Sequence, residues 1–222
     1  MLQAIKGNLV VSCQALENEP LHSPFIMAHM AKAAREGGAA GIRANGYDDI
    51  VAIRAEVNLP IIGIVKRDYP DSDVYITPTR KEVDELLLAK VEMIALDATN
   101  RKRPNHEDLA GLIQYIHHHG TLVMADISTV EEGIDAWKLG VDCLSTTLSG
   151  YTPYSSKQTG PDFELLQKLV KQASIPVIAE GHLNTPADAK KALELGAHSV
   201  VVGSAITRPQ LITKAFVDGM RT

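Results

Sequence analysis

Lys66 directly follows a short apolar run, residues 61–65, and is the strongest single indication of chemistry in the sequence. A lysine amine held in a low-dielectric pocket beside another cation has its pKa lowered toward neutrality, where it can take or give a proton. Arg43 is the expected neighbouring cation. The sequence therefore predicts a base at Lys66, or a nucleophile that forms an imine with a carbonyl substrate. A structural ion pair with Asp97 or Asp126 is the alternative role.

Polar residues end the other apolar runs of the chain as well. If these runs are neighbouring parallel strands, their ends meet at one mouth. Two bases and three acids converging there would be costly to bury unless they paired or reacted. In chain order, the strand-end residues are Gln14, Arg43, Lys66, Asp97, Asp126, Thr147, Glu180 and the pair Gly203-Ser204.

Glu180 is the acid that best complements Lys66. It closes the segment Pro176-Val177-Ile178-Ala179-Glu180, and Gly181 after it lets the backbone approach a ligand closely. We therefore expect Glu180 to act as an acid or base. The alternative is a carboxylate that only anchors Lys66 or Arg43.

The ends of the seventh and eighth runs predict a phosphate site. Gly181, Gly203 and Ser204 can offer backbone N–H groups, and Arg208 can add positive charge where the last helix opens. Barrels often bind phosphate between these loops, at a helix N-terminus. An ordinary glycine-rich turn is the alternative.

The elements that must position these residues alternate along the chain. Helix-start chemistry between the apolar runs appears at Ser23-Pro24, Thr79 to Glu82, Thr129 to Glu132 and Thr185-Pro186. Strict alternation favours parallel strands joined by crossovers. The eight runs predicted as strands are residues 9–13, 41–44, 61–65, 93–96, 122–125, 143–146, 177–179 and 199–202.

A closed barrel fits this order better than an open sheet. An open dinucleotide-binding sheet would carry a glycine-rich fingerprint after its first strand, and Cys13-Gln14-Ala15-Leu16 stands there instead. We therefore predict an α/β protein, a phosphate-binding (β/α)8 TIM barrel, formed as a single domain by residues 1–222. The longest loops, residues 14–22, 67–77 and 149–160, should lie on the side of the site.

Composition points to a small substrate. The net charge of -5 and the pI near 5.9 provide no basic field for a nucleic acid, and no apolar run is as long as a membrane span requires. Cys13 and Cys143 are predicted to be buried, reduced thiols, as is common in the cytoplasm. No His and carboxylate set has metal-ligand spacing, and His117-His118-His119 is typical of a solvated helix end. We therefore expect no metal.

The sequence resembles the bacterial N-acetylmannosamine-6-phosphate 2-epimerases over essentially its whole length. The run Gly-Ile-Val-Lys-Arg-Asp-Tyr at residues 63–69 is highly specific, whereas Gly-Ser-Ala-Ile at 203–206 is shared by many phosphate-binding barrels. Ser149 stands where some members have His, a small difference in a loop. The other matching segments are residues 11–15, 20–22, 41–45, 95–99, 124–127, 146–152, 178–181 and 202–209.

The resemblance implies epimerisation at C2 of N-acetylmannosamine-6-phosphate to N-acetylglucosamine-6-phosphate, in the breakdown of sialic acid and amino sugars. It implies that Lys66 exchanges the C2 proton, that Glu180 is its acid/base partner, and that Gln14, Arg43 and Asp126 hold the sugar. Thr147, as a strand-end residue, joins the expected substrate-binding set. The resemblance also implies that no cofactor is used and that the protein is a homodimer.

Two other functions stay open at the level of sequence. A Schiff-base aldolase acting on a sugar phosphate would also use a strand-end lysine in a phosphate-binding barrel. A catalytically silent barrel with a regulatory or RNA-binding role is the third reading. The acidic pI and the intact acid/base set argue against that last reading.

Overall fold

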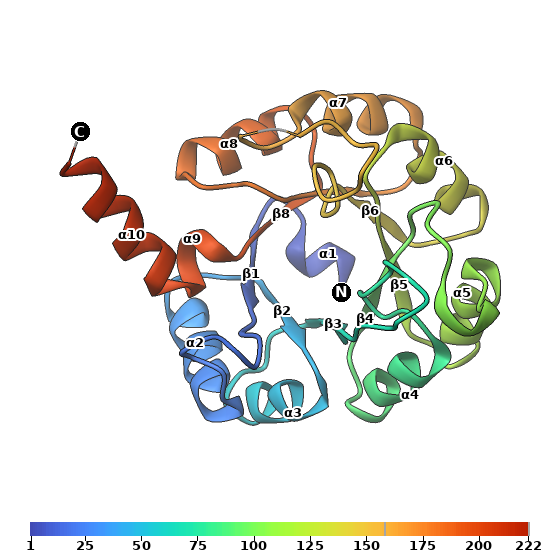
Figure 1. The fold of residues 1–222 in the computed structure, drawn as a ribbon, viewed down its shortest axis with the longest axis horizontal. Helices are drawn as coiled ribbons and strands as arrows, with labels where there is room; N and C mark the ends of the chain where they lie inside the picture. The colour runs from blue at the N-terminus through green and yellow to red at the C-terminus, as the bar shows by residue number, and fades with distance from the viewer. Residues whose placement is uncertain (158, 222) are drawn as a thin grey trace.

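The structure, a computed structural model, describes residues 1–157 and 159–221, and its eight parallel strands close into a barrel in chain order (Figure 1). The prediction of a (β/α)8 barrel is confirmed. The strands are β1 Leu9–Cys13, β2 Gly41–Asn45, β3 Ile61–Ile64, β4 Met93–Asp97, β5 Leu122–Asp126, β6 Cys143–Ser145, β7 Val177–Glu180 and β8 Ser199–Val202.

Helices surround the barrel, and a short one, Leu2–Ile5, lies over the centre of the ring of strands (Figure 1). Ile5 of this short helix is fully buried among side chains of the barrel interior, so it plugs the end at which the strands begin. The helices are α1 Leu2–Ile5, α2 Pro24–Glu36, α3 Tyr47–Glu56, α4 Arg80–Leu88, α5 Leu109–His118, α6 Val130–Lys138, α7 Phe163–Gln172, α8 Pro186–Glu194, α9 Ser204–Thr207 and α10 Pro209–Gly219, with a 3-10 turn, η1, at Pro104–His106.

Local chemistry explains where several helices begin. Thr79 and Thr129 each form a capping box with the glutamate three residues later, and Thr185 forms one with Asp188. These boxes satisfy N–H groups that a helix start leaves unpaired. At Ser23 the helix begins as predicted, with Pro24 at its first position but without a side-chain cap.

The loop after β3 folds back onto the strand, which ends one residue earlier than predicted. Val65 accepts a hydrogen bond from the Thr77 amide (2.8 Å), and Lys66 forms an isolated antiparallel bridge with Ile76. Because this loop takes the backbone groups beyond Ile64, β3 stops short of Val65. The buried Thr77 has a φ of 46°, an unusual conformation for a β-branched residue, at the base of the loop that follows Lys66.

Helix α10 stands away from the barrel wall (Figure 1). None of its residues, all of which the structure describes, is buried. Phe216 is 72% exposed, and Met220, which caps the helix, is 85% exposed. The helix after the last strand therefore leaves apolar side chains uncovered.

Candidate active site

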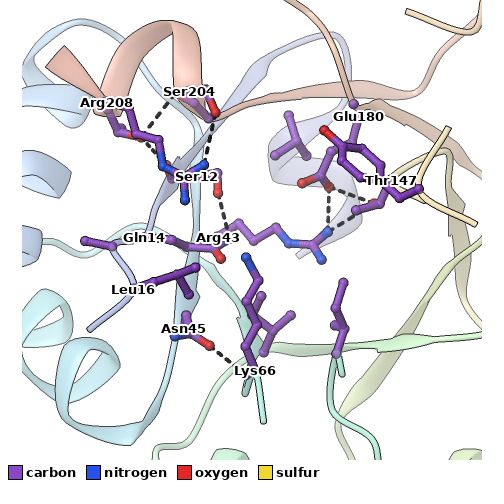
Figure 2. A pocket seen from close by; sticks show the side chains of 18 of the residues that line it. Ser12, Gln14, Leu16, Arg43, Asn45, Lys66, Thr147, Glu180, Ser204 and Arg208 are labelled. Atoms are coloured by element: carbon purple, nitrogen blue, oxygen red, sulfur yellow. Dashed lines mark hydrogen bonds and ion pairs between the residues drawn. The ribbon is translucent and has the colours of Figure 1, made fainter. Parts of the chain in front are cut away.

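A cavity of about 1140 Å3 opens at the carboxyl ends of the strands (Figure 2). Most of the residues predicted from the strand ends therefore lie at one site. The predicted site residues that line it are Gln14, Arg43, Lys66, Thr147, Glu180, Gly181, Gly203, Ser204 and Arg208.

Arg43, near the end of β2, links two carboxylates at the floor of this cavity. Its guanidinium lies 2.5 Å from Asp126 Oδ2 and 2.5 Å from Glu180 Oε2. Burial alone would disfavour the charged guanidinium, but the two carboxylates raise the pKa of Arg43. The arrangement fixes a permanent positive charge in the pocket.

Asp126 does not line the cavity itself. Its two oxygens accept hydrogen bonds from Arg43, and Oδ1 also accepts one from the Thr147 hydroxyl (2.7 Å). The structure thus places Asp126 beneath Arg43, where it holds the guanidinium in place.

Glu180 ends β7 and faces the cavity from the side opposite β3 (Figure 2). Burial raises the pKa of Glu180, and the charge of Asp126 adds to this rise, while Arg43 opposes it. Hydroxyl groups of Thr147 (3.1 Å) and Ser145 (3.4 Å) lie beside its Oε2. A raised pKa makes a carboxyl better suited to hold and donate a proton.

Lys66 projects into the same cavity from the end of β3 (Figure 2). Burial lowers the pKa of its amine to about 8, and the cations Arg43 and Arg208 contribute to the shift. The Asn45 side chain accepts a hydrogen bond from the Lys66 amide (2.8 Å), which ties the end of β3 to the end of β2. Lys66 therefore has a substantial neutral fraction near physiological pH, as a proton-abstracting base requires.

The predicted alternative for Lys66, an ion pair with Asp97 or Asp126, does not occur among the described residues. Asp126 binds Arg43, and Asp97 binds Arg101 (2.5 Å). Asp97 is also held by the amide and hydroxyl of Thr99. Our expectation that Asp97 points into the mouth is wrong, because polar groups in its own loop satisfy this carboxylate away from the cavity.

Gln14 offers an unsatisfied acceptor to the cavity. Its Nε2 donates to Ser12 Oγ (2.7 Å), while its buried Oε1 has no hydrogen-bond partner in the described part of the chain. Buried polar atoms are nearly always paired, so an exception that lines a cavity is suited to accept a hydrogen bond from a ligand.

The loops after β7 and β8 form the other end of the cavity. Gly181 has a φ of 100°, which favours glycine, and a side chain at Gly203 would press on Ser12 at 3.3 Å. Ser204 begins α9, and its hydroxyl accepts a hydrogen bond from Arg208 (3.2 Å). Backbone and guanidinium N–H groups thus gather at this end, as anion binding requires.

Sequence reasoning did not single out several residues that line or support the cavity. Asn45 and Ser145 were missed because only one polar residue was taken from each strand end. Glu19, which binds Arg208, lies 189 residues from it, and nothing in the sequence joins them. Tyr151, in the loop 149–160 that was expected on the side of the site, stacks on His182 with ring centroids 5.1 Å apart.

Metal-ligand geometry is not found at this site. Within residues 1–157 and 159–221, no group of three or more His, Cys, Asp or Glu side chains is arranged to hold a metal ion. The cavity does hold an amine with a lowered pKa, a carboxyl with a raised pKa and the Arg43 guanidinium, which together can move protons and stabilise negative charge.

The fold and the site define a (β/α)8-barrel enzyme whose carboxyl mouth brings together a lysine, a glutamate and two arginines. A family profile described as "NanE: Putative N-acetylmannosamine-6-phosphate epimerase" matches residues 27–222. A "Putative N-acetylmannosamine-6-phosphate 2-epimerase" of Clostridioides difficile (strain 630) is 68% identical over 220 residues, 99% of each chain. This protein belongs to the N-acetylmannosamine-6-phosphate 2-epimerase family.

Solved structures agree with this assignment. The N-acetylmannosamine-6-phosphate 2-epimerase from Clostridium perfringens superimposes with a TM-score of 0.97 at 65% identity, covering 98% of this chain and 95% of that one. Thiamine phosphate pyrophosphorylase from Pyrococcus furiosus, at 21% identity and a TM-score of 0.62 over 93% of this chain and 89% of its own, shares the fold alone. None of the helices that the structure describes is both long and apolar enough to cross a membrane.

Proposed function

We propose that this enzyme interconverts N-acetylmannosamine-6-phosphate and N-acetylglucosamine-6-phosphate by moving the proton at C2. The observation that carries the proposal is the meeting of Lys66 and Glu180 in one cavity, with shifted pKa values and Arg43 between carboxylates. The family membership supports the same substrate.

The first chemical requirement is opening of the sugar ring. The C2 proton of the closed ring is not acidic, whereas a C1 aldehyde lets the proton leave as an enolate. Ring opening moves a proton from the O1 hydroxyl to the ring oxygen. Glu180 assists this transfer, because a carboxyl with a raised pKa takes and returns a proton more readily than an ordinary one.

The second step is removal of the C2 proton by neutral Lys66. The electron pair of the C2–H bond moves into the enolate, and the guanidinium of Arg43 supplies fixed positive charge for the enolate oxygen. A proton from protonated Lys66 or from Glu180 then returns to the opposite face of C2, which re-forms the C2–H bond, restores the aldehyde and completes the inversion. Lys66 and Glu180 come from β3 and β7, which lie on opposite sides of an eight-stranded barrel, and this placement suits an inversion at one carbon.

The remaining predicted residues hold the substrate. Gly181, Gly203, Ser204 and Arg208 bind the phosphate, whose binding energy aligns C2 with Lys66. The unpaired oxygen of Gln14 supports a contact with the sugar or its N-acetyl group. Thr147 and Arg43 contact the substrate from the cavity wall, and Asp126 acts through Arg43.

The decisive experiment follows the reaction in deuterated water by NMR. Wild-type protein should epimerise N-acetylmannosamine-6-phosphate and place deuterium at C2, and Lys66→Ala should lower the rate by about 100-fold or more. Full activity in Lys66→Ala would remove the base from its role, and absence of isotope entry with the wild type would defeat the proposal. Borohydride should trap no covalent adduct on Lys66, which separates this mechanism from imine chemistry.

We further propose that residues 1–222 form one domain and that the enzyme works in the cytoplasm as a homodimer. The free, buried thiols of Cys13 and Cys143 suit a reducing compartment. The exposed apolar side chains of α10 suit a second copy of the chain, since large uncovered apolar surfaces mark interaction sites. Sedimentation equilibrium should give a dimer, and Phe216→Glu should shift it toward monomer; a monomeric wild type would contradict the assignment.

A further inference from the structure

Glu19, in the loop between β1 and α2, binds Arg208 along one edge of its guanidinium. Glu19 Oε2 accepts a hydrogen bond from Arg208 Nη2 (2.9 Å), and Oε1 lies 2.8 Å from Arg208 Nε. Two oxygens facing Nε and Nη2 form a paired contact along one edge of the guanidinium.

This contact leaves the guanidinium edge formed by Nη1 and Nη2 of Arg208 on the side of the cavity. A guanidinium carries five N–H groups in a fixed plane; Glu19 accepts a hydrogen bond from one at Nη2, and its Oε1 lies beside Nε as an ion-pair contact without a hydrogen bond. Nη1 points to the Ser204 hydroxyl at 3.2 Å, at the loop where phosphate is proposed to bind (Figure 2). The edge formed by Nη1 and Nη2 therefore faces the phosphate end of the cavity.

Glu19 is itself held in place before any ligand arrives. Its Oε2 also accepts the Leu16 amide (2.8 Å), and its Oε1 accepts the side-chain amide of Gln210 (3.2 Å). Hydrogen bonds from Leu16 and Arg208 outweigh the effect of burial and lower the pKa of Glu19. Its side chain is only 17% exposed, so the carboxylate is a fixed, ionised support.

We propose that Glu19 is a positioning residue that presents Arg208 to the phosphate of the substrate. A free arginine side chain samples many rotamers, and ordering it on binding has an entropic cost. The contact with Glu19 orders the Arg208 side chain in the free enzyme, so the substrate binds more tightly while the reacting groups stay the same. The inference rests on the proposed binding of phosphate by Arg208.

Glu19→Gln tests the inference because glutamine keeps the size of the side chain but loses the charge and one acceptor oxygen. The KM for N-acetylmannosamine-6-phosphate should rise about tenfold while kcat stays within about twofold of wild type, the pattern of a lost binding contact. The inhibition constant of inorganic phosphate should rise by the same factor. Glu36→Gln, at the exposed end of α2 and outside the cavity lining, is the matched control and should leave both constants unchanged.

A double-mutant cycle distinguishes action through Arg208 from a general effect on the loop. Arg208→Ala alone should raise KM, and adding Glu19→Gln to it should change KM by less than about twofold. A full tenfold effect of Glu19→Gln without Arg208, or a KM that falls in Glu19→Gln, would overturn the inference. If Arg208→Ala leaves KM unchanged, the assignment of Arg208 to phosphate binding fails. Absence of deuterium exchange at C2 with the wild-type protein would instead defeat the proposed reaction.

Discussion

Arg43 and Asp126 form a doubly hydrogen-bonded ion pair sealed beneath the cavity, with Nη2 to Oδ2 at 2.5 Å and Nη1 to Oδ1 at 3.1 Å. Their side chains are 1% and 0% exposed. Removing one partner of such a pair leaves a buried charge without compensation, which costs more than the pair gained by forming.

Asp126→Asn should therefore destabilise the protein strongly. We expect the free energy of unfolding to fall by about 3 kcal/mol, since Arg43 would keep its charge but lose one of its two carboxylate partners and retain only Glu180. Urea denaturation measures the change. Asp135→Asn breaks an exposed ion pair with Lys138 and should change stability by less than about 1 kcal/mol. Equal effects of the two substitutions would contradict the role assigned to Asp126.

The pH dependence of kcat/KM should report the Lys66 amine. Activity should rise with pH through a midpoint near 8, where half of the Lys66 amine is neutral. Arg208 contributes to this shift, so Arg208→Gln should raise the pKa of Lys66 and move the midpoint to more alkaline pH. Arg221→Gln, at the far end of the chain, should leave the midpoint in place. A midpoint that moves to acid in Arg208→Gln would contradict the electrostatic argument.

Lys66 should also reduce the stability of the fold. Its pKa is lower in the folded than in the unfolded chain, so the folded state disfavours the proton; this penalty is absent above the unfolded value near 10.5 and full below about 8. Lys66→Met should therefore raise the free energy of unfolding at pH 7 by about 2 kcal/mol. Thermal and urea unfolding give the measurement, with the surface change Lys190→Met as control. A less stable Lys66→Met protein would show that the amine is well accommodated when charged.

The stacked rings of Tyr151 and His182 should shape substrate binding at the cavity mouth. Their planes differ by 6°, and both residues line the cavity. Tyr151→Ala removes the ring and should lower kcat/KM about fivefold, consistent with the strength of an aromatic contact. Tyr151→Phe keeps the ring and should stay near wild type. If Phe were as impaired as Ala, the hydroxyl rather than the stack would be the important group.

The sequence predicted the barrel well because its strands are buried on both faces. Such strands appear as short apolar runs, and all eight runs correspond to strands with boundaries within one residue. The polar residues that follow them reach the mouth through the same topology. The sequence did not predict which partner a side chain binds: Asp97 binds Arg101 in its own loop. It also did not predict pairs between distant residues, since Glu19 meets Arg208 only because the barrel closes between β1 and β8.

Helix α10 links the proposed dimer contact to the end of the cavity where phosphate is proposed to bind. Arg208 is the residue that caps the start of this helix, and no residue of the helix is buried against the barrel, although Gln210 binds Glu19. Any surface that covers α10 in solution therefore also steadies the backbone of Arg208. For a homodimer, the specific activity should depend on enzyme concentration. Dilution below the dissociation constant of the dimer should weaken substrate affinity before it affects catalysis by the acid–base groups.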